Sequence, residues 1–155
     1  GSGLTDQFPL HMISCQPAHR LHSQYDNGSV SRAAKVAGRE AVWLNPRDAA
    51  LRGIRDGDVV RLFNDRGTCL AGARLTDDVR MGVVRLATGA WYDPDTPGEP
   101  VTLCRHGNPN VLTKDIGTSK LAQGPSAQTC LIEVEPWRGA VPEVKSFVPP
   151  EIETR

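Results

Sequence analysis

The sequence lacks an excess of charge of either sign, because 18 Lys and Arg residues balance 18 Asp and Glu residues. Proteins that bind nucleic acids or anionic membranes through their general charge usually show a basic excess. The sequence also lacks an apolar run of about 18 residues, the length that a membrane-spanning helix needs. These absences argue against a nucleic-acid-binding protein, an anionic-membrane binder and a membrane-spanning protein.

Short metal-binding cysteine spacings are absent as well. The four cysteines lie at positions 15, 69, 104 and 130 and form no C-x-x-C pair, so a structural zinc knuckle is not expected. Four cysteines allow two disulfides, but a domain of this size does not need them. Cys69 and Cys130 lie in apolar runs. We therefore expect buried free thiols and a reducing compartment, the cytoplasm, with the periplasm as the alternative.

Glycine and proline are abundant, with 15 and 12 residues, and they indicate many turns and a β-rich fold. A short helix is expected over 46–52, since Asn45 can cap it, Pro46 suits its first position and Gly53 ends it. One or two helical turns are expected over 29–37, before Gly38. Apolar runs between turns predict strands at 10–14, 41–44, 59–63, 68–75, 83–87 and 128–135. This spacing favours a small closed or nearly closed barrel.

The length of 155 residues fits one domain, and no internal repeat is evident. We interpret residues 1–3 as a cloning scar, residues 4–137 as the barrel domain and residues 138–155 as an extended C-terminal tail. Because the chain has neither a Met start nor a leader, we expect it to be a fragment of a longer protein.

The first polar segment, residues 15–24, allows several interpretations. Cys15, His19 and His22 are metal-ligand types, but their C-x₃-H-x₂-H spacing is not a recognised zinc motif. His22 and Ser23 are adjacent in sequence, which does not place a base opposite a nucleophile. Arg20, with the two histidines, has the donors that a phosphate or pyrophosphate prefers. A solvated loop whose histidines only cap turns is the alternative.

Further polar segments follow in the second half of the chain. Residues 88–109 are rich in turn residues, and so long an irregular stretch is either a functional loop or evidence against the predicted elements. Asn110 and Gln128 each carry a donor and an acceptor that suit the edge of a heterocycle. The segment 117–120 has a superficial likeness to a P-loop but lacks its full G-x-x-x-x-G-K-[ST] pattern, and we set it aside.

Seven motifs occur in a fixed order over about residues 8–137: His19-Arg20-Leu21-His22-Ser23-Gln24, Val36-Ala37-Gly38-Arg39-Glu40, Asn45-Pro46-x-Asp48-Ala49-Ala50-x-Arg52-Gly53-Ile54, Asp56-Gly57-Asp58-Val59-Val60-Arg61, Asn64-x-Arg66-Gly67, Gly89-x-Trp91-Tyr92-Asp93-Pro94 and Asn110-Val111-Leu112-Thr113-x-Asp115-Ile116-Gly117-Thr118-Ser119-Lys120-Leu121. As a set, they resemble the C-terminal cofactor-binding domain of the molybdopterin enzymes of the dimethyl sulfoxide reductase family. The resemblance is to the branch of dimethyl sulfoxide, trimethylamine N-oxide and biotin sulfoxide reductases.

The resemblance implies a mainly β fold, a six-stranded double-psi β-barrel with short helices and long cofactor-facing loops. In that family the domain covers the bis(molybdopterin guanine dinucleotide) cofactor from one side. The molybdenum is held by two dithiolenes and a serine of another domain, so we expect neither a catalytic residue nor a metal ligand in this chain. The cofactor-binding candidates are Gln16, His19, Arg20, His22, Ser23, Asn110 and Gln128. Gln16 departs from the family pattern, which often has His there.

The leading functional hypothesis is therefore a cofactor-binding domain of a molybdenum oxidoreductase that reduces S-oxides or N-oxides. The fragment alone is expected to show no turnover, and its partners are the N-terminal domains of the parent enzyme. A stand-alone adaptor or interaction module with the same barrel is the alternative, because a fold does not fix a function. A hydrolase is a third hypothesis, and the proximity of His22 and Ser23 is the one observation that supports it.

Overall fold

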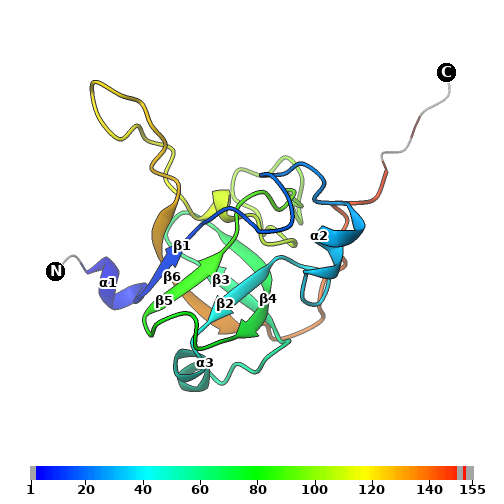
Figure 1. Ribbon diagram of the computed structural model, residues 1–155, viewed down its shortest axis with the longest axis horizontal. Coiled ribbons are helices and arrows are strands. Elements are labelled where there is room, and N and C mark those ends of the chain that lie inside the picture. The colour runs from blue at the N-terminus through cyan, green and yellow to red at the C-terminus, as the bar shows by residue number, and fades with distance from the viewer. Residues whose placement is uncertain (1–2, 150–151, 153–155) are drawn as a thin grey trace.

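The computed structural model describes residues 3–149 and residue 152, so Gly1 and Ser2 of the predicted scar lie outside the described residues. Six strands close into a barrel in the order β1-β5-β2-β4-β3-β6 (Figure 1). They are β1 (Leu10–Ile13), β2 (Ala41–Leu44), β3 (Val59–Phe63), β4 (Thr68–Leu75), β5 (Val83–Leu86) and β6 (Thr129–Pro136). The predicted fold class, a mainly β six-stranded barrel with short helices, is confirmed.

The strand pairing explains why the long connections gather at one end of the barrel. β1 pairs in parallel with β5, and β2 pairs in parallel with β4, whereas the other four pairs are antiparallel. Parallel strands require a crossover connection, which a tight hairpin cannot supply. The segments between β1 and β2 and between β5 and β6 lie together over the upper end of the barrel (Figure 1). Residues 115–127 project from that end as an arm.

The barrel interior is filled by aliphatic side chains from alternate strand positions. Burial alternates along β1 and β3, as expected where one face of a strand meets the core. The core side chains of the six strands are Leu10, Met12, Val42, Leu44, Val60, Leu62, Cys69, Ala71, Ala73, Val84, Leu86, Ile132 and Val134. This core gives the loops above it a rigid base.

The helices are short. α3 (Pro46–Arg52) has the predicted bounds: the Asn45 side chain accepts a hydrogen bond from the Arg47 amide at 3.0 Å, and Gly53 ends the helix at a φ of 67°. α2 (Ser29–Ala33) is shorter than the predicted 29–37, because Val36 and Arg39 instead pair across a tight turn. α1 (Leu4–Gln7) and the 3₁₀ helix η1 (Pro109–Val111) were not predicted.

Among the described residues, no helix has the length and apolar character needed to cross a bilayer.

The four cysteines are free. Cys69 and Cys104 are buried, and burial raises the pKa of the Cys69 thiol well above its usual value. Cys15 and Cys130 are only half-buried, so the expected burial holds for two of the four thiols.

The segment after β6 has no helix or strand over residues 138–149, yet it packs back onto the loop end of the barrel. The Lys145 amide donates to the Asp93 carboxylate at 2.7 Å, and the Arg39 guanidinium donates to the Pro142 carbonyl. The Phe147 ring packs edge-on against His106, with 4.9 Å between ring centroids. The domain limits of 4–137 and 138–155 stay a prediction.

The substitution Gly72→Ala tests how closely the turn at Val36 packs on β4. A Cβ at Gly72 would collide with the backbone and side chain of Val36, and neither can move away easily. We expect the free energy of unfolding to fall by about 2–3 kcal/mol in urea titrations. Gly124→Ala in the exposed arm is the control and should change it by less than about 1 kcal/mol. Equal effects of the two substitutions would contradict this packing.

Candidate functional site

Two adjoining pockets open at the loop end of the barrel, and together we call them the rim groove. Their volumes are about 400 Å³ and about 280 Å³, and both are lined by His22, Thr88 and Asn110. The other lining residues are Ser14, Cys15, Gln16, Ser23, Gly89, Ala90, Trp91, Tyr92, Asn108, Ala127 and Gln128. Pockets of this size hold part of a cofactor or a small ligand.

The rim groove brings together five of the seven predicted site residues: Gln16, His22, Ser23, Asn110 and Gln128. They come from three segments that are far apart in the sequence. Within the described part of the chain, no hydrogen bond occupies the side chains of Ser23, Asn110 or Gln128. These groups are therefore available to donate to and accept from a bound molecule.

Gln16 and His22 hold each other in place at the edge of the groove. The His22 backbone amide donates to the Gln16 side-chain oxygen at 3.2 Å, and the Gln16 side-chain nitrogen donates to His22 Nδ1 at 2.9 Å. Using both ends of the Gln16 amide fixes its orientation. His22 adopts a φ of 50°, a left-handed conformation that few residues with a side chain adopt. Such local strain is typical of functional loops.

The groove also depends on two residues that the sequence analysis did not select, Gly89 and Trp91. Gly89, at a φ of 90°, lies against the His22 backbone, and a Cβ there would collide with the His22 carbonyl oxygen. The Trp91 indole nitrogen donates to the Ser23 carbonyl at 2.8 Å. Both residues lie in the quoted motif Gly89-x-Trp91-Tyr92, so the signal was present but was not interpreted as part of the site.

Four charged residues form a cluster beneath the groove: Arg20, Asp26, Lys35 and Glu40, which we call the buried charge cluster. Arg20 contacts Glu40 at 3.0 Å, and Lys35 contacts Asp26 at 2.8 Å and Glu40 at 3.1 Å. The side chains of Arg20 and Asp26 are fully buried. Two cations and two anions leave the cluster formally neutral, which makes the burial of so many charges tolerable.

Arg20 links this cluster to the groove through the backbone. Its guanidinium donates to the His22 carbonyl at 3.0 Å and to the Thr88 carbonyl at 2.9 Å. The structure therefore places Arg20 behind the groove wall rather than on its surface, where the predicted anion contact would need it. His19 also points away from the groove, into a separate pocket on the side of the barrel. Neither side chain lines the rim groove.

Two buried groups near the cluster have shifted pKa values. Burial alone would raise the pKa of Asp26, but hydrogen bonds from Lys35 and from the Trp91 amide lower it below its usual value. Burial, followed by the nearby Lys35 charge, lowers the pKa of His106. His106 is therefore neutral, and its Nδ1–H donates to the Trp91 carbonyl at 2.9 Å. The Trp91 backbone is thus held on both sides by the buried groups.

The chemistry of the groove suits a polar heterocycle that carries anionic groups. None of the residues that line either pocket is acidic, so nothing in the lining repels an anion. Amide, hydroxyl and imidazole groups supply both donors and acceptors. Among the described residues, no group of three or more His, Cys, Asp or Glu side chains is arranged to hold a metal.

The chain is similar in sequence to reductases of trimethylamine N-oxide and dimethyl sulfoxide. The chain is 54% identical over 141 residues to trimethylamine-N-oxide reductase 1 of Escherichia coli K12, covering 90% of this chain and 17% of that protein. It is 48% identical over 149 residues to the dimethyl sulfoxide/trimethylamine N-oxide reductase of Cereibacter sphaeroides, covering 96% of this chain and 18% of that protein. The chain thus spans less than one-fifth of the length of these relatives.

A solved structure, acetylene hydratase from Pelobacter acetylenicus, shares the fold with a TM-score of 0.66 at 16% identity, covering 86% of this chain and 19% of that one. Residues 10–131 match the molydopterin dinucleotide binding domain family, which confirms the predicted resemblance and the class of cofactor. The match takes in all the predicted site residues and five of the six strands in full. The chain therefore belongs to the molydopterin dinucleotide binding domain family.

Proposed function

We propose that this chain is the cofactor-binding domain of a longer molybdenum oxidoreductase that reduces N-oxides or S-oxides. Its rim groove would cover one side of a bis(molybdopterin guanine dinucleotide) cofactor. The support is the identity of about half of the residues with reductases of trimethylamine N-oxide and dimethyl sulfoxide, of which the chain spans 17–18%. The remaining domains of that longer protein are then its partners.

The observation that carries the proposal is the convergence of unpartnered amides on one groove. Asn110 and Gln128 lie 18 positions apart, on opposite sides of the arm, yet both line the same pocket with exposed side chains. A pterin edge alternates donors and acceptors, which side-chain amides match in pairs. The groove lining contains no Asp or Glu that would repel the negatively charged pyrophosphate of the cofactor. The residues present therefore fit the cofactor.

When bound, the cofactor supplies the redox chemistry, and the protein supplies binding, orientation and exclusion of water. In this chain, Asn110, Gln128 and Ser23 would contact the cofactor directly. Gln16 would orient the His22 ring, since it already holds it in the structure. Arg20 would act as a positioning residue, because its guanidinium holds the His22 and Thr88 carbonyls from behind. No side chain here is assigned to the chemical step, so the chain alone should show no turnover.

The compartment belongs to the proposal too. The four cysteines are free thiols, which supports a reducing compartment and hence the cytoplasm. The periplasm stays the alternative, and a redox-state measurement of the thiols in cells would distinguish the two.

The double variant Asn110→Ala, Gln128→Ala tests the proposed contacts in the full-length protein. It removes two side-chain amides that make no hydrogen bond within the described chain, so folding should be unaffected. We expect the molybdenum and guanine nucleotide content after dialysis to fall about tenfold, as lost hydrogen bonds of roughly 1.4 kcal/mol in total would produce. Mass spectrometry measures both contents.

The matched control is Gln7→Ala, which removes an exposed amide of α1, away from the groove. It should retain its cofactor as the unmodified protein does. The proposal fails if the double variant retains as much cofactor as this control.

The variant Asp26→Asn tests whether the buried charge cluster supports the fold that carries the groove. Because the folded pKa of Asp26 lies below its usual value of 3.8, its ion pairs stabilise the fold above that pH. This contribution is lost as the pH falls further, through the folded pKa. We expect the free energy of unfolding at pH 7 to fall by about 3–5 kcal/mol, since two buried cations lose a partner. Urea titrations from pH 7 to pH 2 measure it.

The difference in stability between the unmodified chain and Asp26→Asn should shrink as the solution becomes more acidic than the folded pKa. Asp77→Asn, at an exposed turn position, serves as the control and should change little at any pH. A difference that stays constant over the whole pH range would rule out a stabilising charge on Asp26.

A further inference from the structure

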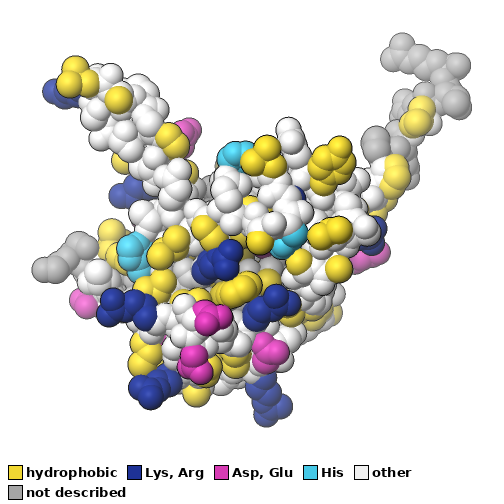
Figure 2. All heavy atoms as spheres, viewed as in Figure 1, with side chains coloured by type: hydrophobic (Ala, Val, Ile, Leu, Met, Phe, Trp, Pro, Cys, Tyr) yellow, Lys and Arg dark blue, Asp and Glu magenta, His cyan; other side chains and the backbone are white. Residues whose placement is uncertain are grey.

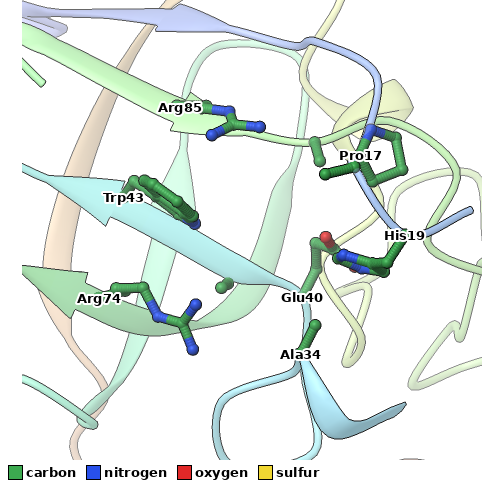
Figure 3. Close-up of a pocket in the computed structure, with 10 residues that line it drawn as sticks. Pro17, His19, Ala34, Glu40, Trp43, Arg74 and Arg85 are labelled. Carbon is green, nitrogen blue, oxygen red and sulfur yellow. The ribbon is translucent and has the colours of Figure 1, made fainter. Parts of the chain in front are cut away.

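A strip of two arginines and a tryptophan lies on the outer face of the barrel, and one of its arginines contacts Cys15, a residue that also lines the rim groove. Trp43 of β2 is in register with Arg74 of β4 on one side and with Arg85 of β5 on the other. The guanidinium carbons of Arg74 and Arg85 lie 5.7 Å and 4.5 Å from the centre of the Trp43 ring. Figure 3 shows the indole between the two guanidinium groups. We call these three residues the Arg–Trp–Arg strip.

The charges of this strip are not neutralised within the described part of the chain. No carboxylate lies within 4.0 Å of Arg74 or Arg85 there, whereas Arg20, Arg52, Arg61 and Arg105 all have such partners. Arg85 donates instead to the Cys15 sulfur at 2.8 Å. Glu40 lines the adjoining pocket, but its carboxylate is occupied by Arg20 and Lys35. Two unpaired cations therefore flank one apolar ring.

A small cavity opens beside the strip, with a volume of about 130 Å³. Half of its ten lining residues are alanine or proline, and Figure 3 shows Pro17, Ala34 and His19 around it. Figure 2 shows an apolar patch on the face formed by β2, β4 and β5, with Lys and Arg side chains beside it and Asp and Glu side chains below it. The space suits one side chain of moderate size rather than a cofactor. It shares no lining residue with the rim groove.

The two cations and the apolar ring and cavity of this face together indicate the chemistry of its occupant. Two guanidinium groups held apart by an aromatic ring can each bind a carboxylate, and the cation–π contacts already fix their positions. The indole and the apolar cavity favour an aliphatic or proline residue beside that carboxylate. The chain as a whole carries no net positive charge, so this local pair, rather than a general field, has to provide the attraction.

We propose that the Arg–Trp–Arg strip is a docking surface for an acidic segment from the rest of the longer protein. Carboxylates of that segment would pair with Arg74 and with Arg85, and a neighbouring apolar side chain would cover Trp43 and enter the cavity. The inference rests on the proposed function, which makes this chain one domain of a longer polypeptide. The chain spans only 17% of the length of its Escherichia coli relative, so most of the polypeptide that could supply such a segment lies outside it.

Arginine-selective labelling with phenylglyoxal tests the proposal, with modification of each arginine followed by peptide mass spectrometry. The 155-residue chain and the full-length protein are labelled side by side. We expect Arg74 and Arg85 to react at least tenfold more slowly in the full-length protein. The control, Arg55, is exposed beyond α3 and should react equally in both. Equal rates for Arg74 and Arg85 in the two proteins would overturn the proposal.

A concentration series of the 155-residue chain separates docking from self-association. Protection of both arginines that grows with its concentration would identify a second copy as the occupant and would also overturn the proposal. Protection only in the full-length protein supports it.

The charge-reversed variant Arg74→Glu, Arg85→Glu gives a second readout, with Arg55→Glu as its control. In the full-length protein we expect the docked segment to be cleaved by a protease at least tenfold faster in the double variant than in the control. In the 155-residue chain, the urea midpoints of the two variants should agree. A double variant that lowers this midpoint, with no change in cleavage of the full-length protein, would show a purely structural role.

These results are independent of cofactor binding. Loss of cofactor from the Asn110→Ala, Gln128→Ala variant with arginine protection retained supports both proposals. Arginine protection without any effect of that variant on cofactor content would contradict the rim contacts alone. Cofactor loss without arginine protection would overturn the docking surface alone.

Discussion

The buried charge cluster is the interaction on which the rim groove depends. Arg20, Lys35, Asp26 and Glu40 come from the long connection between β1 and β2. They tie together the parts of that connection that lie before and after the short helix α2. Leaving one of these buried charges without a partner costs several kcal/mol, so the cluster favours one arrangement of the loop. Through Arg20, that arrangement fixes the carbonyls of His22 and Thr88, two residues that line the groove.

The barrel supports the loops of the groove, and the buried charge cluster orders them. The aliphatic core and the closed strand order provide a rigid base, and the parallel pairs force long crossover connections over one end of it. The cluster then orders those connections, and Phe147 adds a contact from the C-terminal segment to His106 and Trp91. The groove can therefore present unpartnered amides without collapsing onto them. The outer face of β2, β4 and β5 stays free for a separate contact.

The strands and α3 could be predicted from the sequence, because their signals are local: apolar runs between turns, and a cap, a proline and a glycine around residues 46–52. The spacing of the strands favoured a closed barrel and the resemblance implied six strands, but the order in which they pair was not predicted, since no local pattern specifies which strands pair. The same distinction applies to the site. Asn110 and Gln128 were selected by their chemistry and lie in the groove. Arg20 was selected as an anion contact by the same reasoning, but its burial depends on Asp26 and Glu40, whose proximity is set only by the folded loop.

The central claim is that the exposed amides of the rim, rather than the buried Arg20, contact the cofactor. A structure of the full-length protein with its cofactor bound tests this most directly. The account predicts the side-chain amides of Asn110 and Gln128 within hydrogen-bonding distance of the cofactor, with Arg20 still paired to Glu40 and holding the His22 carbonyl. A cofactor that contacts the Arg20 guanidinium while both amides remain in solvent would contradict it.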